Sequence, residues 1–588
     1  STVAYAELRD PASIADGLAA IVKGSPFEDG LNLLHNRKDA AKEIRLVGGS
    51  TALAGAALLA SPEFLAEFRK IRGAAIGFFG LTAGGEPKIA ACVLTGDSLA
   101  AALYARSYLA NESTLRRVAV VDGVPIFQSR ALPAQAYDPN TGKPVPFEPK
   151  AATEGPCEPT YAYTTGLFIV ASNKEAIAEV LARNRGAAKD SLATSNDFPA
   201  QRPAGIHAFV RTIELVALAD AARKANKEIL PAELVAALKL VLNPRSIPKA
   251  TAHATLGPAG LRWTIDLHRD PKQPSPLLDL VGSAVPVEAL RTIPTGAAGG
   301  FSIGLPAKDR RVAAILAFVD ALLKTDGNVG RTATEWVEEW EARSKLPLRA
   351  KLLPEVRGLS LILIPKPDLP PRVEPLPLVA IQLEAGASDW ESAIPKFLAA
   401  VDGRDPSAKP SSETIGNVKV LTASLAGMPQ HFARRENSWI FGLDRKQVAA
   451  CCSGGGPIPA LADHAVGAIR WPGLVQYETP RKLAGRLEHR SRGSNPFDVP
   501  FGGGLLPLGL LDPQNGGEMT AEEFQSLYGA FPPLTLRANH TANRFSVELR
   551  WDFDRDGANG FLTKLVPILE RIGTAPSNEG LRFSPFDR

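Results

Sequence analysis

Two stretches, LFIVASNKEAIAEVLA (residues 167–182) and WIFGLDRKQVAACC (residues 439–452), share one pattern and decide the predicted fold. Each has a short apolar run typical of a buried strand, then a polar residue that can cap a helix, then an amphipathic helical segment. The capping residue is Ser172 or Asn173 in the first stretch and Asp444 in the second. The same order of elements recurs outward from both stretches, so we predict that the chain contains one domain twice.

The ends of the two predicted copies support this interpretation. VAYAEL (3–8) leads into the helical pattern SIADGLAAIVK (13–23), and FSIGL (301–305) leads into RRVAAILAFVDALLK (310–324). Near the other end of each copy, alternating runs within 249–268 and 533–553 predict antiparallel hairpins.

We therefore predict an α+β fold, a tandem duplication of a mostly antiparallel sheet domain with helices packed on one face. The first repeat covers residues 1–290, with a Pro/Gly-rich insertion at 133–159. The second repeat covers 295–588, with a long insertion at 477–519. Long segments of this kind are often functional, so we expect partners to bind at these insertions.

Composition excludes several classes of protein. The 588 residues carry 66 basic and 62 acidic side chains, a balance that argues against a nucleic-acid-binding protein. The longest uncharged apolar stretch, residues 46–62, is short and rich in Gly and Ala, so no transmembrane segment is predicted. Because the chain begins at Ser1, we expect that a preceding segment has been removed. Four cysteines make no disulfide framework, and one bridge from Cys157 to Cys451 or Cys452 is left open.

A resemblance to known proteins rests on three segments of the first repeat. These are the strand, cap and Ala-rich helix of Phe168–Ala182, the tripeptide Ser191-Leu192-Ala193, and the pair Asp197-Phe198. In this order they resemble an uncharacterised family of exported bacterial proteins. The resemblance covers the first half best, since the second half lacks the Ser-Leu-Ala segment. It implies export and a repeated α+β domain, and it supplies no activity and no site residues.

The only metal site that the sequence suggests is an acidic run near the C-terminus. Asp552, Asp554, Asp556 and Asn559 alternate around a Gly turn in the manner of a calcium loop. The twelfth position of such a loop requires an acidic residue, and here it is Thr563. The alternative is that these carboxylates continue the alternation of the preceding strand and face solvent.

No pattern of catalytic residues appears along the chain. The eight histidines include no pair at helical spacing, and the metalloprotease, nucleophile-elbow and dinucleotide-binding motifs are absent. No catalytic residue and no cofactor other than calcium is therefore assigned. We predict a non-enzymatic, exported structural or binding protein that acts in the cell envelope or in assembly, with a protein or envelope component as partner. We expect it outside the cytoplasm, in the periplasm, at the cell surface or secreted.

Two other functions are left open by the sequence. One is a hydrolase-type enzyme with a site in the cleft between the halves, where the fold would assemble the catalytic residues. The other is a calcium-stabilised adhesive module. The sequence does not decide the oligomeric state.

Overall fold

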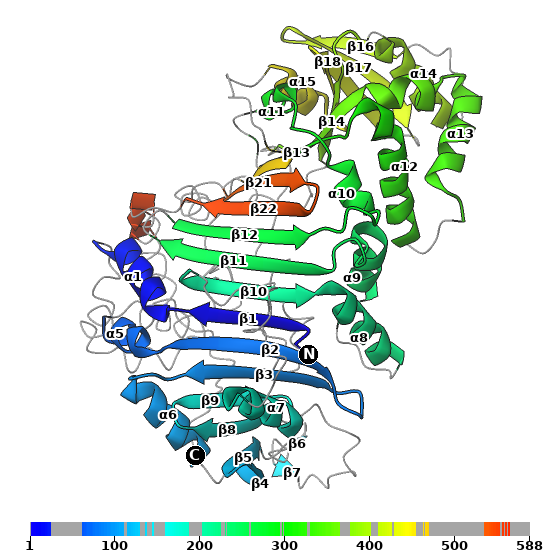
Figure 1. The fold of residues 1–588 in the computed structure, drawn as a ribbon. Helices are drawn as coiled ribbons and strands as arrows, with labels where there is room; N and C mark the ends of the chain where they lie inside the picture. The colour runs from blue at the N-terminus through cyan, green and yellow to red at the C-terminus, as the bar shows by residue number, and fades with distance from the viewer. Residues whose placement is uncertain are drawn as a thin grey trace.

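The strands of both halves join in one antiparallel sheet, seen in the computed structural model of the chain (Figure 1). The structure describes residues 2–24, 62–110, 115–129, 136–137, 144–145, 159–186, 203–224, 230, 232–257, 260–294, 297, 299–325, 330–364, 377–387, 389–401, 410–425, 428–453, 463, 465–469, 534–552, 556–557, 559–560 and 563–564. Within these residues the main sheet has 20 strands, and β6 (Ala136–Tyr137) and β7 (Pro144–Val145) form a separate two-stranded sheet. The predicted mixture of helices with antiparallel sheet is confirmed.

The strands of the two halves follow the same spatial order. From the outer edge inward, the first half has β4 (Leu115–Val121), β5 (Val124–Ser129), β8 (Thr160–Thr164), β9 (Leu167–Ala171), β3 (Pro87–Leu94), β2 (Gly73–Leu81), β1 (Ala4–Arg9), β10 (Gly205–Arg211), β11 (Lys249–Gly257) and β12 (Gly260–His268). The second half has β16 (Ser411–Ile415), β17 (Val418–Leu425), β18 (Met428–Arg435), β19 (Ser438–Gly442), β15 (Leu378–Leu383), β14 (Val356–Leu363), β13 (Gly299–Gly304), β20 (Ala465–Ile469), β21 (Leu534–Thr541) and β22 (Arg544–Trp551). When the main-sheet strands of each half are numbered along the chain, their spatial order in the sheet is the same in the two halves.

Helices occupy matching places between these strands. In the first half they are α1 (Pro11–Val22), α5 (Pro62–Lys70), α6 (Leu99–Leu109), α7 (Lys174–Asn184), α8 (Thr212–Lys224), α9 (Ala232–Ala237), η2 (Leu238–Leu242), α10 (Pro276–Leu280) and α11 (Val287–Arg291). In the second half they are α12 (Lys308–Thr325), α13 (Ala333–Ser344), η3 (Leu348–Leu352), η4 (Leu353–Glu355), α14 (Trp390–Val401) and α15 (Arg445–Ser453). α6 and α14 each follow the third strand of their half, and α7 and α15 each follow the seventh.

The halves meet where β12 pairs with β22, a junction that we call the seam. Thr264 is the fifth residue of β12 and lies opposite Glu548, the fifth residue of β22. Outward from this pair, Trp263 faces Leu549 and Ile265 faces Val547. The register is therefore symmetric about its centre. It also aligns the apolar residues of both strands on one face, because side chains alternate along a strand.

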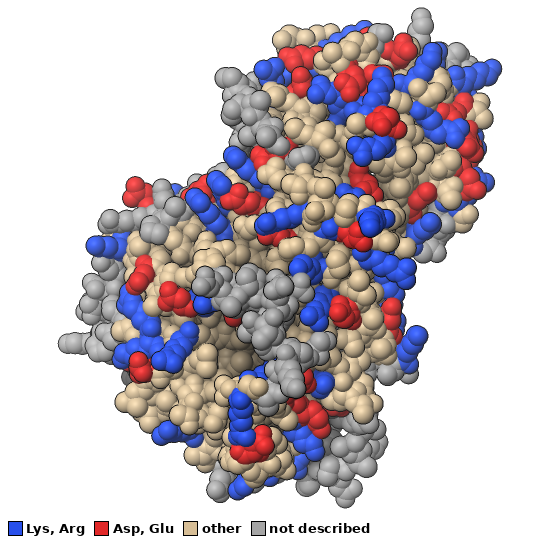
Figure 2. Space-filling view, viewed as in Figure 1, with Lys and Arg blue, Asp and Glu red and all other residues tan. Residues whose placement is uncertain are grey.

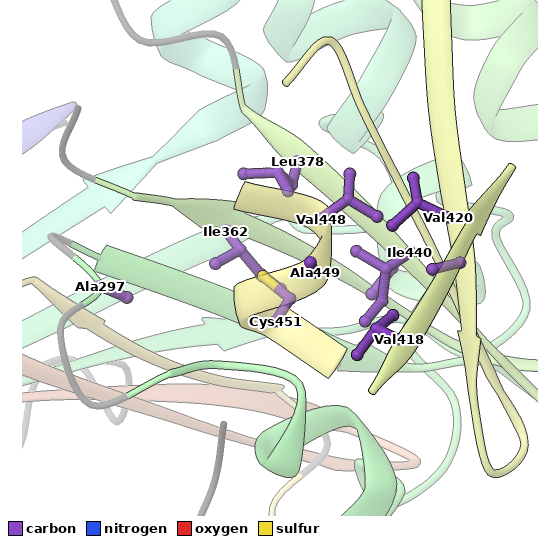
Figure 3. Close-up of a cluster of buried hydrophobic side chains, with 11 residues drawn as sticks. Ala297, Ile362, Leu378, Val418, Val420, Ile440, Val448, Ala449 and Cys451 are labelled. Carbon is purple, nitrogen blue, oxygen red and sulfur yellow. The ribbon is translucent and has the colours of Figure 1, made fainter. Parts of the chain in front are cut away.

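Helices cover both faces of the sheet, which corrects the prediction that they pack on one. In β18 the adjacent residues Phe432 and Ala433 point to opposite faces; Phe432 packs in the cluster of α14 and Ala433 in the cluster of α15. Figure 3 shows Val448, Ala449 and Cys451 of α15 packed among strand residues that include Ile440.

The first half has the same arrangement at its outer strands. Ala162 of β8 packs in the cluster of α7, whereas the preceding residue, Tyr161, meets Tyr108 of α6 at 5.2 Å between ring centroids. The physical reason lies in the sequence, since the continuous apolar runs of β9 and β19 bring apolar side chains to both faces of the sheet.

The helix caps predicted from the sequence are confirmed. Asn173 caps α7 by accepting a hydrogen bond from the backbone N–H of Ala176 at 3.0 Å, while Ser172 binds the neighbouring strand instead. Asp444 accepts from the backbone N–H groups of Lys446 and Gln447 at 2.9 and 3.0 Å, at the start of α15.

Candidate functional site

The register of the sheet places one residue from each of twelve strands in a single apolar row that crosses the seam. The row runs Ala74, Leu8, Ile206, Ala254, Trp263, Leu549, Leu536, Gly467, Phe301, Leu361, Val379 and Phe441, each directly opposite the next. Directly opposite residues share one face of a sheet, and neighbouring strands lie about 4.8 Å apart, so this row spans roughly 50 Å. We call it the apolar row.

Part of the apolar row is open to solvent on both sides of the seam. Ile206 is 46% exposed in the first half, and Phe301, Leu361 and Val379 are 41%, 45% and 39% exposed in the second. Ile76 of β2 lies on the same face and is also exposed. Contiguous exposed apolar residues on a folded protein mark a surface for a partner or ligand. The apolar row is therefore the candidate functional site.

The opposite face of the central strands is polar. Its central row is Glu7, His207, His253, Thr264, Glu548 and Arg537, each opposite the next. The rings of His207 and His253 stack with centroids 4.4 Å apart, and His207 Nε2 donates to the carbonyl of Pro203 at 2.8 Å. The hydroxyl of Tyr5 donates to Glu7 at 3.0 Å.

Arginines bind the carboxylates of the seam on this polar face. Arg544 Nε donates to Asp266 Oδ1 at 2.7 Å, and the hydroxyl of Ser546 donates to the same oxygen at 2.6 Å. Arg550 Nε donates to Glu548 at 2.6 Å, and this hydrogen bond raises the pKa of Arg550 above its ordinary value. Both carboxylates therefore accept hydrogen bonds from arginines. This arrangement favours a structural role for the seam over a role of Asp266 or Glu548 as a general base.

The residues of the suggested calcium loop are only partly described. Asp554 lies outside the described residues, whereas Asp552, Asp556 and Asn559 lie within them. Asn559 Nδ2 donates to the carbonyl of Lys23 at 3.4 Å, which brings the C-terminal segment to the end of α1. In the part of the chain that the structure describes, no three His, Cys, Asp or Glu side chains gather closely enough to hold a metal ion.

Other residues singled out in the sequence lie partly beyond the described part. Cys157 and the insertion 477–519 are outside it, as is most of 133–159. Cys451 and Cys452 are free thiols.

A surface hollow of about 690 Å³ lies in the second half between α13 and η3, away from the seam, and Glu341 and Arg349 line it as an ion pair.

Three thiols, of which Cys451 is buried and Cys92 and Cys452 are half-buried, are expected to be unreactive in the native protein. Burial raises the pKa of Cys92 and Cys452 to about 11 and that of Cys451 to about 12. Only the thiolate reacts, so at pH 8 a Cys157→Ser variant should react with a thiol-specific disulfide reagent about a hundredfold slower when native than when unfolded in urea. A rapid native phase equal to one or more thiols would contradict this expectation.

Comparison with known proteins gives no match to a family model, a curated protein or a solved structure. Among the described residues, no helix has both the length and the apolar character that are needed to cross a bilayer. The site is therefore defined by its geometry. Sequence patterns alone missed the apolar row, because the row takes one residue from each of twelve strands and depends on their register.

Proposed function

We propose that the protein is a non-enzymatic binding protein of the cell envelope and that the apolar row is its binding surface. The observation that carries the proposal is the continuity of the row, whose members are apolar on every strand from β2 to β19. A row of this length, exposed in both halves, suits an extended apolar partner such as a protein segment or a lipid chain. Export, which the family resemblance implies, belongs to the same proposal.

Charged substitutions in the apolar row are expected to weaken apolar binding. A variant with both Ile206→Asp and Leu361→Asp introduces one carboxylate into the exposed row of each half. Because transfer of a charge to an apolar contact is unfavourable, we expect the bound fluorescence of anilinonaphthalene sulfonate to fall by about half or more. Titration of the dye against each protein measures the change.

Leu234→Asp provides the matched control. Leu234 is 46% exposed, as Ile206 is, but it lies on α9 and outside the apolar row. It should leave the dye fluorescence unchanged. The proposal is wrong if the double variant binds the dye as the wild type does, or if partners isolated from the native host bind both proteins equally.

We also propose that the two halves arose by tandem duplication. The proposal is supported by the identical strand order and by the symmetric register of the seam. Two contacts between the halves also support the proposal. α10 of the first half contacts α12 of the second, and Asn559 of the C-terminal segment contacts the end of α1. In each half, a segment that follows the last strand thus contacts the first helix of the other half.

The alternative functions gain no specific observation from the described residues. A hydrolase would require a free acid or base in the cleft between the halves, and the seam carboxylates Asp266 and Glu548 are bound by arginines. A calcium-stabilised adhesive module would require the loop that includes Asp554, which lies outside the described part. We therefore retain the binding proposal.

A further inference from the structure

Helix α6 carries an unusual apolar surface at the outer end of the first half. Leu99, Leu103 and Tyr104 are 67%, 55% and 68% exposed. Leu99 and Leu103 lie one turn apart in one stripe along the helix, and Tyr104 lies beside this stripe with its ring centroid 6.2 Å from that of Tyr108. Ala105 is the buried residue of α6, and Tyr108 packs on β8. The helix is therefore anchored by one side and presents leucine and tyrosine side chains on the other.

The edge strand β4 continues this surface. Val120 is 48% exposed and lies opposite Pro125, while Arg117 lies opposite Phe127, which in turn faces Tyr161. Tyr161 contacts Tyr108 of α6, so this side of β4 belongs to the face that α6 covers. We call Leu99, Leu103, Tyr104 and Val120 the α6 patch.

The helix of the second half that corresponds to α6 is α14, and it has no such exposed surface. α13 packs against α14, and Trp340 of α13 meets Phe397 of α14 at 5.4 Å in an edge-to-face contact. Ala393, Ile394 and Leu398 of α14 are buried. Among the described residues, the apolar surface of α6 is therefore exposed, whereas that of α14 is covered by α13.

Arginines border the α6 patch. Arg106 and Arg117 are exposed, and the guanidinium of Arg106 lies 5.6 Å from the ring centroid of Tyr163. At the N-terminal end of α6, the carboxylate of Glu67 is engaged by Lys70 and by the hydroxyl of Ser98. Leucine and tyrosine flanked by arginine is the combination that favours the interface of an anionic bilayer.

We propose that the α6 patch docks the protein onto an anionic lipid surface. The apolar side chains would enter the interfacial region while Arg106 and Arg117 meet the lipid phosphates. A second copy of the chain fits less well, because a two-fold contact would bring two surfaces bordered by arginines together, and like charges repel each other. The proposal rests on the proposed envelope function, for which it names a partner.

Sedimentation with lipid vesicles tests the proposal. The wild type should sediment with vesicles of phosphatidylglycerol and phosphatidylcholine, and much less with phosphatidylcholine alone. Replacing both arginines, Arg106→Glu with Arg117→Glu, should weaken binding about twentyfold or more at low salt. Leu103→Glu with Tyr104→Glu should weaken it similarly, and Leu234→Glu should have no effect.

Several results would overturn the proposal. These are failure of the wild type to bind vesicles, equal binding to both vesicle types, or unchanged binding of the two double variants. Self-association of the wild type that the double variants abolish, without vesicle binding, would identify a second copy as the occupant. A large fall in melting temperature for Leu103→Glu with Tyr104→Glu, without vesicle binding, would show that the chain itself covers the patch. The Ile206→Asp and Leu361→Asp variant separates the two proposals, since it should bind less dye and still bind vesicles as the wild type does.

Discussion

Replacing Arg311 by methionine is expected to lower the free energy of unfolding of the second half by about 3–5 kcal/mol. Arg311 is 4% exposed, and its Nε donates to the carbonyl of Pro306 at 3.0 Å. The same guanidinium also donates to the carbonyl of Pro354 and to Glu384. Methionine fills similar space without a donor, so the buried carbonyls lose their hydrogen bonds. Urea denaturation followed by circular dichroism measures the change.

Two further variants show whether hydrogen bonding causes this loss. Arg310→Met changes the exposed neighbour on the same helix and should shift the midpoint little. Arg311→Lys keeps the charge but cannot reach all three acceptors, so an intermediate loss is expected. If Arg311→Met were as stable as Arg310→Met, the buried guanidinium would not hold α12 to the ends of β14 and β15.

Phe545→Ala is expected to destabilise the protein by about 3–5 kcal/mol, because it opens a cavity at the seam. Phe545 is buried on β22 and lies opposite Leu267 of β12. It packs in a cluster with Ile247 and Leu278, which belong to the first half, and with Ala538 of β21. The substitution therefore removes contacts that join the halves. Urea denaturation, with limited proteolysis between the halves as a second readout, measures the effect.

A smaller loss is expected from Phe545→Leu, since leucine leaves less of the space empty. Leu234→Ala removes an exposed side chain of α9 and should have little effect on stability. Phe545→Ala with a loss below about 1 kcal/mol would contradict the view that this cluster couples the halves.

The sequence predicted the hairpins beside the seam and two helix caps correctly. The alternation of GLRWTIDLH and RFSVELRW is present as β12 and β22, and each forms the expected hairpin with the preceding strand. Asn173 and Asp444 cap the helices for which they were proposed. These features depend on neighbouring residues and on the period of side-chain direction, both of which a sequence displays.

The prediction that helices pack on one face of the sheet was wrong, and the sequence of the outer strands explains why. In LFIVA of β9, successive residues are apolar, so both faces need cover. Alternating strands such as β12 have one polar face instead. The outer and central parts of the sheet thus follow different patterns, and a single rule for the whole domain missed the difference.

By itself, the sequence determined the class of the fold, its antiparallel hairpins and the repeated order of its elements, because alternation and capping are local properties. Only the tertiary structure decided the seam and the apolar row. The register between strands distant in the chain depends on long-range pairing, which places Ile206 and Leu361 on one face across more than 150 positions of sequence. The α6 patch depends equally on tertiary contacts, because the exposure of a side chain on a helix depends on the elements that pack against that helix. α14 packs against α13, whereas Leu99 and Leu103 of α6 are exposed to solvent.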